Sequence, residues 1–188
     1  LLVLMAAAAA ASAAATTTKR GAFILFEGVD RCGKTTQCKR LLQWLRSSAA
    51  GAPGLGEERV EFMRFPDRTT AIGSTINSYL TNATDMSDEA IHLLFAANRW
   101  EAAAQIRQKL AAGVTIVCDR YSYSGVAFTS AKPGMDLDWC KRPEKGLPSP
   151  DVVLFLDMSI EQAKERGNFG DERYEKEDFQ RTVRDRFQ

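Results

Sequence analysis

Residues 28–35 have the sequence GVDRCGKT, which fits the pattern GxxxxGK[ST] at every fixed position. In this pattern, glycines let the backbone curl so that successive N–H groups face phosphate oxygens, and the following helix adds its positive N-terminus. Lys34 would neutralise the charge on a transferred phosphoryl group, and the Thr35 hydroxyl would hold Mg²⁺. The segment therefore predicts a loop that binds a nucleoside triphosphate. The alternative is an ordinary glycine-rich turn with a solvated lysine.

Asp119 is the candidate partner of this loop near the metal ion. It directly follows an apolar run at residues 114–118, so its carboxylate would lie at the end of a strand. The alternative is a helix cap or a salt bridge. The tetrapeptide NKxD, with which GTPases read guanine, is absent from the chain, and this disfavours a GTPase.

An acceptor site is predicted from one aromatic residue and three arginines. Phe95 and Arg99 are four residues apart and share one face of a helix, where a ring can stack on a base and a guanidinium can hydrogen-bond to it. Arg68 and Arg120 follow predicted strands and could bind an acceptor phosphate through bidentate contacts. The alternatives are core packing for Phe95 and surface ion pairs for Arg68 and Arg120.

Three further polar or aromatic residues lie near these candidates. We interpret His92 as structural, because no nucleophile or metal partner is evident near it in the sequence. Tyr121 and Tyr123 are predicted to shape the wall of the acceptor pocket.

The elements that must position these residues alternate between strands and helices. Continuous apolar runs predict buried strands at 22–26, 60–65, 114–118 and 152–156. Helical spacing predicts helices at about 35–45 and 72–80, a long helix capped by Ser87 and stopped by Gly113, and a last one through Phe179, Val183 and Phe187. The fold class is therefore α/β, with a parallel sheet covered by helices on both faces. Ligands of such sheets bind at the carboxyl ends of the strands.

Composition narrows the function classes. The chain has 188 residues, enough for one well-cored domain, and a formal net charge of +1, which argues against nucleic acid as a partner. Its four cysteines form no CxxC pair and there is one histidine, so neither a zinc site nor a disulfide framework is expected. We therefore expect a reducing compartment.

Residues 1–20 are predicted to be a low-complexity, alanine-rich tail. Residues 1–18 carry no charge, but they are mostly Ala, Ser and Thr and no basic segment precedes them, so a membrane anchor or secretory signal is disfavoured. An organelle transit peptide is the alternative, although Lys19 and Arg20 are its only basic residues. Met5 is a candidate start. We expect a cytoplasmic protein, with a nuclear location compatible and a mitochondrial or plastid copy left open.

Several motifs together resemble the eukaryotic-type thymidylate kinases, a branch of the P-loop nucleoside monophosphate kinases. These motifs are GVDRCGKTTQ at 28–37, RFPDR at 64–68, LLFAANRW at 93–100, DRYSYSGVAF at 119–128, DWCK at 138–141 and RGNFGDERY at 166–174. The resemblance extends from about residue 21 to the end. It implies transfer of the γ-phosphate of ATP to dTMP, with Mg²⁺ as cofactor, no membrane partner and a homodimer. It also implies a lid near 159–174.

The resemblance assigns roles residue by residue. Phe95 would stack on thymine, Arg99 would bond its carbonyl, Asp30 would bond the sugar 3′-hydroxyl, and Phe128 would crowd a ribose 2′-hydroxyl. The residues assigned to dTMP are Asp30, Phe65, Arg68, Phe95, Arg99, Arg120, Ser124, Gly125, Phe128 and Tyr174. Those assigned to ATP are Gly28, Arg31, Cys32, Gly33, Lys34, Thr35, Thr36 and, against the adenine, Arg166. The catalytic group is Lys34, Arg31, Asp119 and Arg120, and the metal would be held by Thr35 directly and by Asp119 through water.

The chain departs from this pattern in two ways. Cys32 places a thiol inside the loop, where a helix N-terminus could make it oxidisable. The family fold has five parallel strands and only four are readable, so we expect the domain at 21–188 to be truncated at its C-terminal end and poorly stable or weakly active alone. Two rival functions stay open: a kinase for UMP/CMP or thymidine, and a nucleotide-binding switch without turnover.

Overall fold

Parallel strands form the centre of the protein. The computed structural model describes residues 19–47, 54–166 and 172–188. Within these ranges one sheet has the order β2-β3-β1-β4, with β1 at Phe23–Glu27, β2 at Val60–Arg64, β3 at Thr115–Asp119 and β4 at Val152–Phe155. All three strand pairings are parallel. The predicted parallel sheet is confirmed, and its carboxyl ends meet at one edge, where Asp119 pairs with Phe26 on one side and Arg64 on the other.

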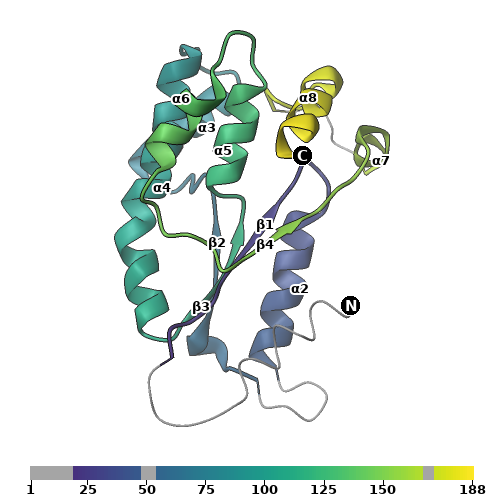
Figure 1. Ribbon diagram of the computed structural model, residues 1–188. Coiled ribbons are helices and arrows are strands. Elements are labelled where there is room, and N and C mark those ends of the chain that lie inside the picture. Colours follow the sequence, from purple (N-terminus) through teal and green to yellow (C-terminus); the bar gives the residue numbers. More distant parts are fainter. Residues whose placement is uncertain (1–18, 48–53, 167–171) are drawn as a thin grey trace.

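Helices cover the two faces of this sheet (Figure 1). Helix α2 packs against one face, whereas α4 packs against β3 from the other and carries α3 and α5 on its flank. The helices described are α2 (Lys34–Arg46), α3 (Ala71–Leu80), α4 (Asp88–Ala111), α5 (Ser122–Ser130), α6 (Leu137–Lys141), α7 (Ile160–Glu165) and α8 (Glu177–Phe187), with short 3₁₀ turns η1 (Glu57–Arg59) and η2 (Arg142–Glu144). Among these, no helix is long and apolar enough to cross a membrane.

The two faces are built by alternation along the central strands. Phe23 and Leu25 of β1 point into a core shared with Ile106 of α4, whereas Phe26 packs with Cys38 of α2. Successive strand side chains point to opposite faces, so an uninterrupted apolar run is what a strand between two helical layers requires.

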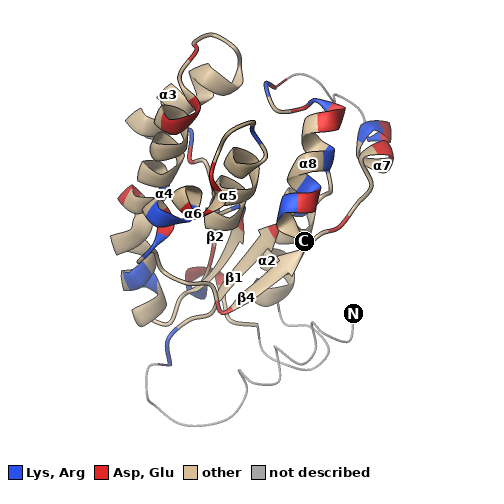
Figure 2. Cartoon of the chain, turned by 45° about the horizontal axis from the view of Figure 1, so that its top comes forward, with Lys and Arg blue, Asp and Glu red and all other residues tan. Residues whose placement is uncertain are grey.

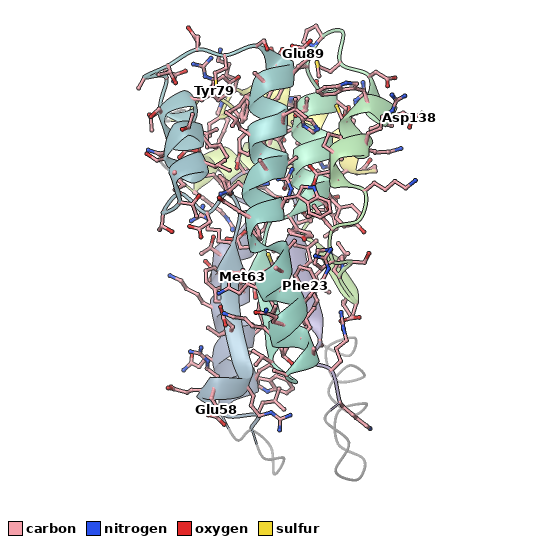
Figure 3. All side chains as sticks on the ribbon, turned by 90° about the vertical axis from the view of Figure 1, so that its left-hand side faces the viewer. Phe23, Glu58, Met63, Tyr79, Glu89 and Asp138 are labelled. Carbon is pink, nitrogen blue, oxygen red and sulfur yellow. The ribbon has the colours of Figure 1, made fainter. Side chains whose placement is uncertain are left out.

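The long helix α4 begins and ends where the sequence predicts. The Ser87 side chain accepts a hydrogen bond from the amide of Ala90, with Asp88 and Glu89 in the first turn. Acidic residues there favour the positive helix end. Gly113, with φ of 83°, follows the last turn. Figure 3 shows α4 running along the molecule, with Glu89 near one end and Glu58 at the opposite end of the domain.

The prediction that β4 is buried is wrong. Val152, Val153 and Phe155 are 37%, 41% and 38% exposed. Among the described strands, β4 is the edge strand next to β1, and its apolar side chains therefore remain partly open to solvent. Its position in the chain is nevertheless as predicted.

Helices α5, α6 and α7 were not predicted from sequence spacing. Helix α5 has the sequence SYSGVAFTS, which contains few strong helix formers, and its N-cap residue Tyr121 supplies no side-chain cap. The last predicted helix is confirmed as α8. Of the predicted N-terminal tail at residues 1–20, residues 1–18 lie outside the described residues.

Candidate active site

The phosphate-binding loop connects β1 to α2 at the carboxyl edge of the sheet. Gly28, Arg31 and Gly33 have φ values of 144°, 63° and 96°, all in the region that L-residues rarely adopt. A Cβ on Gly28 would lie 2.6 Å from the carbonyl oxygen of Leu156, so only glycine fits. The backbone therefore curls into the N-terminus of α2, as the sequence pattern requires.

Lys34 is folded into this loop. Its ammonium donates to the carbonyl oxygen of Val29 at 2.5 Å and lies 3.5 Å from the sulfur of Cys32. Burial, followed by the charge of Arg120, lowers the pKa of Lys34. The lysine thus sits in a desolvated position where its charge acts strongly on an anion.

Thr35 and Asp119 meet at the edge of the sheet, as predicted. The Thr35 hydroxyl donates a short hydrogen bond to the carboxylate of Asp119, which is 1% exposed at the end of β3. A hydroxyl and a carboxylate are hard oxygen donors of the kind Mg²⁺ prefers. The donor chemistry of this pair therefore fits a magnesium ion.

Arg120 joins the loop to the β3–α5 turn. It has φ of 67°, and its guanidinium donates to the Gly28 carbonyl oxygen at 3.0 Å, the Ser124 hydroxyl at 2.9 Å and the Asp30 carboxylate at 2.6 Å. Asp30 also accepts from Gln180 of α8 at 2.6 Å. Burial opposes the ionisation of Asp30, but the positive charges around it outweigh that effect and lower its pKa.

A single cavity beside the loop brings together the ten residues that the resemblance assigned to dTMP. Arg64, Pro66, Leu80, Tyr121, Thr129 and Glu172 complete its lining. Phe95 lines this cavity and also packs against the apolar cluster between α3 and α4, so the two interpretations of that residue are compatible.

Glu144 was missed by the sequence reasoning and forms a buried ion pair with Arg99. The two side chains are 7% and 3% exposed, and Arg99 Nε donates to Glu144 Oε2 at 2.8 Å while Nη2 donates to Oε1. A Cβ on Gly125 would lie 2.4 Å from Arg99 Nη2. Glu144 and the absence of a side chain at Gly125 together fix where the guanidinium lies.

Two glutamates that precede α8 contact two further arginines of the site. Arg68 pairs with Glu172 at 2.8 Å and donates to Asn77 at 2.9 Å. Arg31 pairs with Glu175 at 2.9 Å. Figure 2 shows basic and acidic segments alternating along α7 and α8. Neither glutamate could be singled out from sequence, because both lie in a strongly charged segment.

Aromatic rings cover the cavity on its α8 side. The ring centroids of Phe128 and Tyr174 are 5.7 Å apart, and Tyr174 stacks on Phe179 at 5.3 Å. The guanidinium of Arg120 lies 5.0 Å from the Phe128 centroid. Burial raises the pKa of Tyr174, so its hydroxyl stays neutral.

Three other residues assigned to ATP differ in how far they are exposed beside the phosphate loop. Cys32 is buried against Val29 and Ile160. Thr36 is exposed on the first turn of α2. Exposed Arg166 follows α7 and donates to the carbonyl oxygen of Arg31 at 3.4 Å.

The interpretation of His92 is confirmed and that of Tyr123 is wrong. His92 is fully buried and hydrogen-bonds to the Thr129 hydroxyl at 2.8 Å and the Cys140 carbonyl oxygen at 2.9 Å. Tyr121 lines the cavity as expected, whereas the side chain of Tyr123 is 47% exposed and does not. Tyr121 is the N-cap residue of α5 and faces inward, whereas Tyr123 lies in the first turn of that helix and faces solvent.

Glu27 is a second buried carboxylate that the sequence reasoning missed. It ends β1, is 1% exposed, and accepts hydrogen bonds from the amides of Tyr121 at 2.9 Å and Ser124 at 3.1 Å. The Ser124 hydroxyl donates to it at 2.5 Å. Burial raises its pKa, while these hydrogen bonds and the charge of Arg120 act in the opposite direction.

A curled phosphate loop at the carboxyl edge of a parallel sheet, with a cavity lined by arginines beside it, defines a P-loop kinase. The Thymidylate kinase family model matches residues 26–188. The chain is 53% identical to a thymidylate kinase of Danio rerio over 170 residues, covering 90% of this chain and 76% of that protein. It is 52% identical to one of Homo sapiens over 162 residues, covering 86% and 73%. The chain belongs to the thymidylate kinase family.

The fold comparison agrees with this assignment. The solved structure of thymidylate kinase from Candida albicans superposes with a TM-score of 0.79 at 43% identity, covering 89% of this chain and 76% of that one. The structure of the enzyme from Ehrlichia chaffeensis superposes with a TM-score of 0.67 at 26% identity.

Proposed function

We propose that this protein transfers the γ-phosphate of ATP to dTMP, producing dTDP and ADP. One observation carries the proposal: the phosphate loop opens beside a cavity lined by all ten residues assigned to dTMP. A donor phosphate on the loop and an acceptor phosphate on Arg68 and Arg120 would therefore lie next to each other. Membership of the thymidylate kinase family supports the same reaction.

Catalysis would depend on alignment and charge, because phosphoryl transfer requires little covalent participation by the protein. Lys34 and Arg31 would neutralise the donor phosphates from within the loop, and Arg120 would orient the acceptor phosphate. Thr35 directly, and Asp119 through water, would hold Mg²⁺, which supplies neutralisation of the charge that develops on the phosphates.

Recognition of the nucleoside would depend on the far wall of the cavity. Phe95 would stack on thymine while Arg99, oriented by Glu144, donates to its carbonyl. Asp30 would accept a hydrogen bond from the sugar 3′-hydroxyl. Phe128, which lines the cavity, would crowd a ribose 2′-hydroxyl and would therefore favour deoxynucleotides. Tyr174 would cover the sugar.

We also propose that the kinase domain spans residues 21–188 and that the protein acts in the cytoplasm. We further propose that it forms a homodimer. Leu93 and Trp100 support the dimer, because they are 49% and 39% exposed on α4. Exposed apolar side chains on one helix fit packing against a second copy. Sedimentation velocity would test it: a single species of monomer mass at micromolar concentration would contradict it. The proposed lid at 159–174 falls partly outside the described residues and remains a prediction.

The experiment that tests the reaction is acceptor-dependent ADP release. The protein is incubated with Mg-ATP and, in parallel, dTMP, UMP, CMP or thymidine. We expect release with dTMP alone. Release with UMP, CMP or thymidine instead would keep the phosphate loop and overturn the acceptor site. No acceptor-dependent release from folded protein would favour a nucleotide-binding switch.

A further inference from the structure

The side chain of Glu27 makes hydrogen bonds to the turn between β3 and α5, in addition to the backbone pairing of its own strand. It is the last residue of β1, immediately before Gly28, and its buried carboxylate crosses to the turn between β3 and α5. Its three hydrogen bonds come from the amides of Tyr121 and Ser124 and from the Ser124 hydroxyl, all of them neutral donors. A carboxylate with only acceptor sites matches three donors pointing at one place.

These contacts cap helix α5 from a distance. Tyr121 is the N-cap residue of α5 and supplies no side-chain cap, and Ser124 is the third residue of the helix. In a local capping box, the amides at these two positions are satisfied by side chains of the helix itself. Here one carboxylate from another strand accepts both, and its negative charge faces the positive helix end.

The same carboxylate restrains Arg120. The residue before the cap, Arg120, has φ of 67°, a conformation that costs free energy for a non-glycine residue and persists only where its surroundings impose it. Glu27 fixes the backbone that follows Arg120 through the Tyr121 amide. It also orients the Ser124 hydroxyl, which accepts from Arg120 Nη1 at 2.9 Å.

We propose that Glu27 is a positioning residue for Arg120: it holds the guanidinium, through the Tyr121–Ser124 turn, at the place where the acceptor phosphate binds. The inference rests on the proposed function only in that Arg120 binds this phosphate. Glu27 itself does not line the cavity. Its effect on binding should therefore be confined to the phosphate of dTMP.

The variants Glu27→Gln and Ser124→Ala test this. Glu27→Gln keeps the size of the side chain but removes the charge and presents an amide N–H₂ to Ser124. Ser124→Ala removes the hydroxyl between Glu27 and Arg120 but leaves both capped amides in place. The matched control is Glu58→Gln, since Glu58 is exposed on η1 at the far end of the domain from the site.

The experiment compares the binding of dTMP with that of thymidine, which lacks the phosphate. We expect both variants to weaken dTMP binding by about 10- to 100-fold, the range for losing one charge-assisted hydrogen bond, and to leave the inhibition constant of thymidine within about twofold. The KM for ATP should also stay within about twofold, and the double variant should lose less than the product of the two single losses.

Three outcomes would overturn the proposal. Equal weakening of dTMP and thymidine by Ser124→Ala would mean that this serine acts on the nucleoside and not through Arg120. Unchanged dTMP binding in a folded Glu27→Gln protein would mean that Glu27 serves the fold alone. If Glu27→Gln does not fold, the comparison of dTMP with thymidine binding in Ser124→Ala decides whether the proposal holds.

Absence of dTMP-dependent ADP release in the wild type would overturn the proposed function, and this inference with it.

Discussion

The buried pair of Arg99 and Glu144 allows a stability prediction with a calculable size. Both side chains are under 10% exposed and are joined by two hydrogen bonds. Glu144→Ala would leave the guanidinium buried without its partner, which costs about 3–5 kcal/mol of unfolding free energy. In a domain of this size, 1 kcal/mol corresponds to about 2–4 °C in Tm. We therefore expect Tm to fall by roughly 6–20 °C, and by less for Glu144→Gln, which retains one acceptor.

The same change should weaken dTMP binding, because Arg99 loses the group that orients it in the cavity. We expect the KM for dTMP to rise by about tenfold or more, the cost of one misplaced charge-assisted hydrogen bond, while the KM for ATP stays constant. Thermal unfolding followed by circular dichroism, together with steady-state ADP release, measures both effects. Glu58→Gln is the control, because Glu58 is exposed on η1 at the far end of the domain from the cavity.

A double variant separates stability from binding. Replacing a buried ion pair with apolar residues of similar size is often neutral or stabilising. Arg99→Met with Glu144→Leu should therefore recover most of the lost Tm but not dTMP binding. The reasoning is refuted if Glu144→Ala melts within 1 °C of the Glu58→Gln control, a limit set by the ~0.5 kcal/mol typical of neutral surface changes.

Three further predictions concern the loop, the acceptor arm and pH. Lys34→Ala should lower kcat for ADP release by about 10²- to 10⁴-fold, as for other preorganised charges, and unchanged turnover would contradict the mechanism. Asn98 is 1% exposed, and its side chain hydrogen-bonds to both the amide and the carbonyl oxygen of Asp67, next to Arg68. Asn98→Ala should therefore raise the KM for dTMP and lower the free energy of unfolding in urea by about 2 kcal/mol. An unchanged free energy of unfolding would exclude this anchoring role. Burial lowers the pKa of His92, the single histidine, so the folded state holds it neutral while the unfolded chain protonates it. Unfolding free energy should fall as pH drops below about 6.5, by up to about 1.4 kcal/mol per unit, and an equal slope in His92→Gln would disprove this origin.

The parts of the fold that could be predicted from sequence are those whose signals are local. The phosphate loop carries its glycines, lysine and threonine within eight residues, and α4 carries its own cap at Ser87. The strands are short apolar runs, which is what a sheet covered on both faces requires. Such a run does not reveal whether its strand is central or at an edge, and so β4 was placed correctly but judged buried.

The parts that could not be predicted depend on groups distant in the chain. Helix α5 has a weak sequence of its own and is capped by Glu27, 94 residues before Tyr121. Glu144 is 45 residues from Arg99, and Glu172 is 104 residues from Arg68. These partners are acidic residues like many others in the chain, and only the tertiary fold distinguishes them.

Three of the arginines around the loop and cavity are paired with carboxylates that a nucleotide would have to displace: Arg68 with Glu172, Arg31 with Glu175 and Arg120 with Asp30. The protein thus supplies its own counter-ions. Under the proposed function, nucleotide binding is an anion exchange, in which phosphate oxygens take the places of internal carboxylates. Because each guanidinium already has a carboxylate partner, the cluster attracts anions less at long range, and its affinity for phosphate depends less on ionic strength than the affinity of three arginines without such partners would. Small inorganic anions have to displace a tethered carboxylate before they can bind, so the tether discriminates in favour of ligands with several points of attachment.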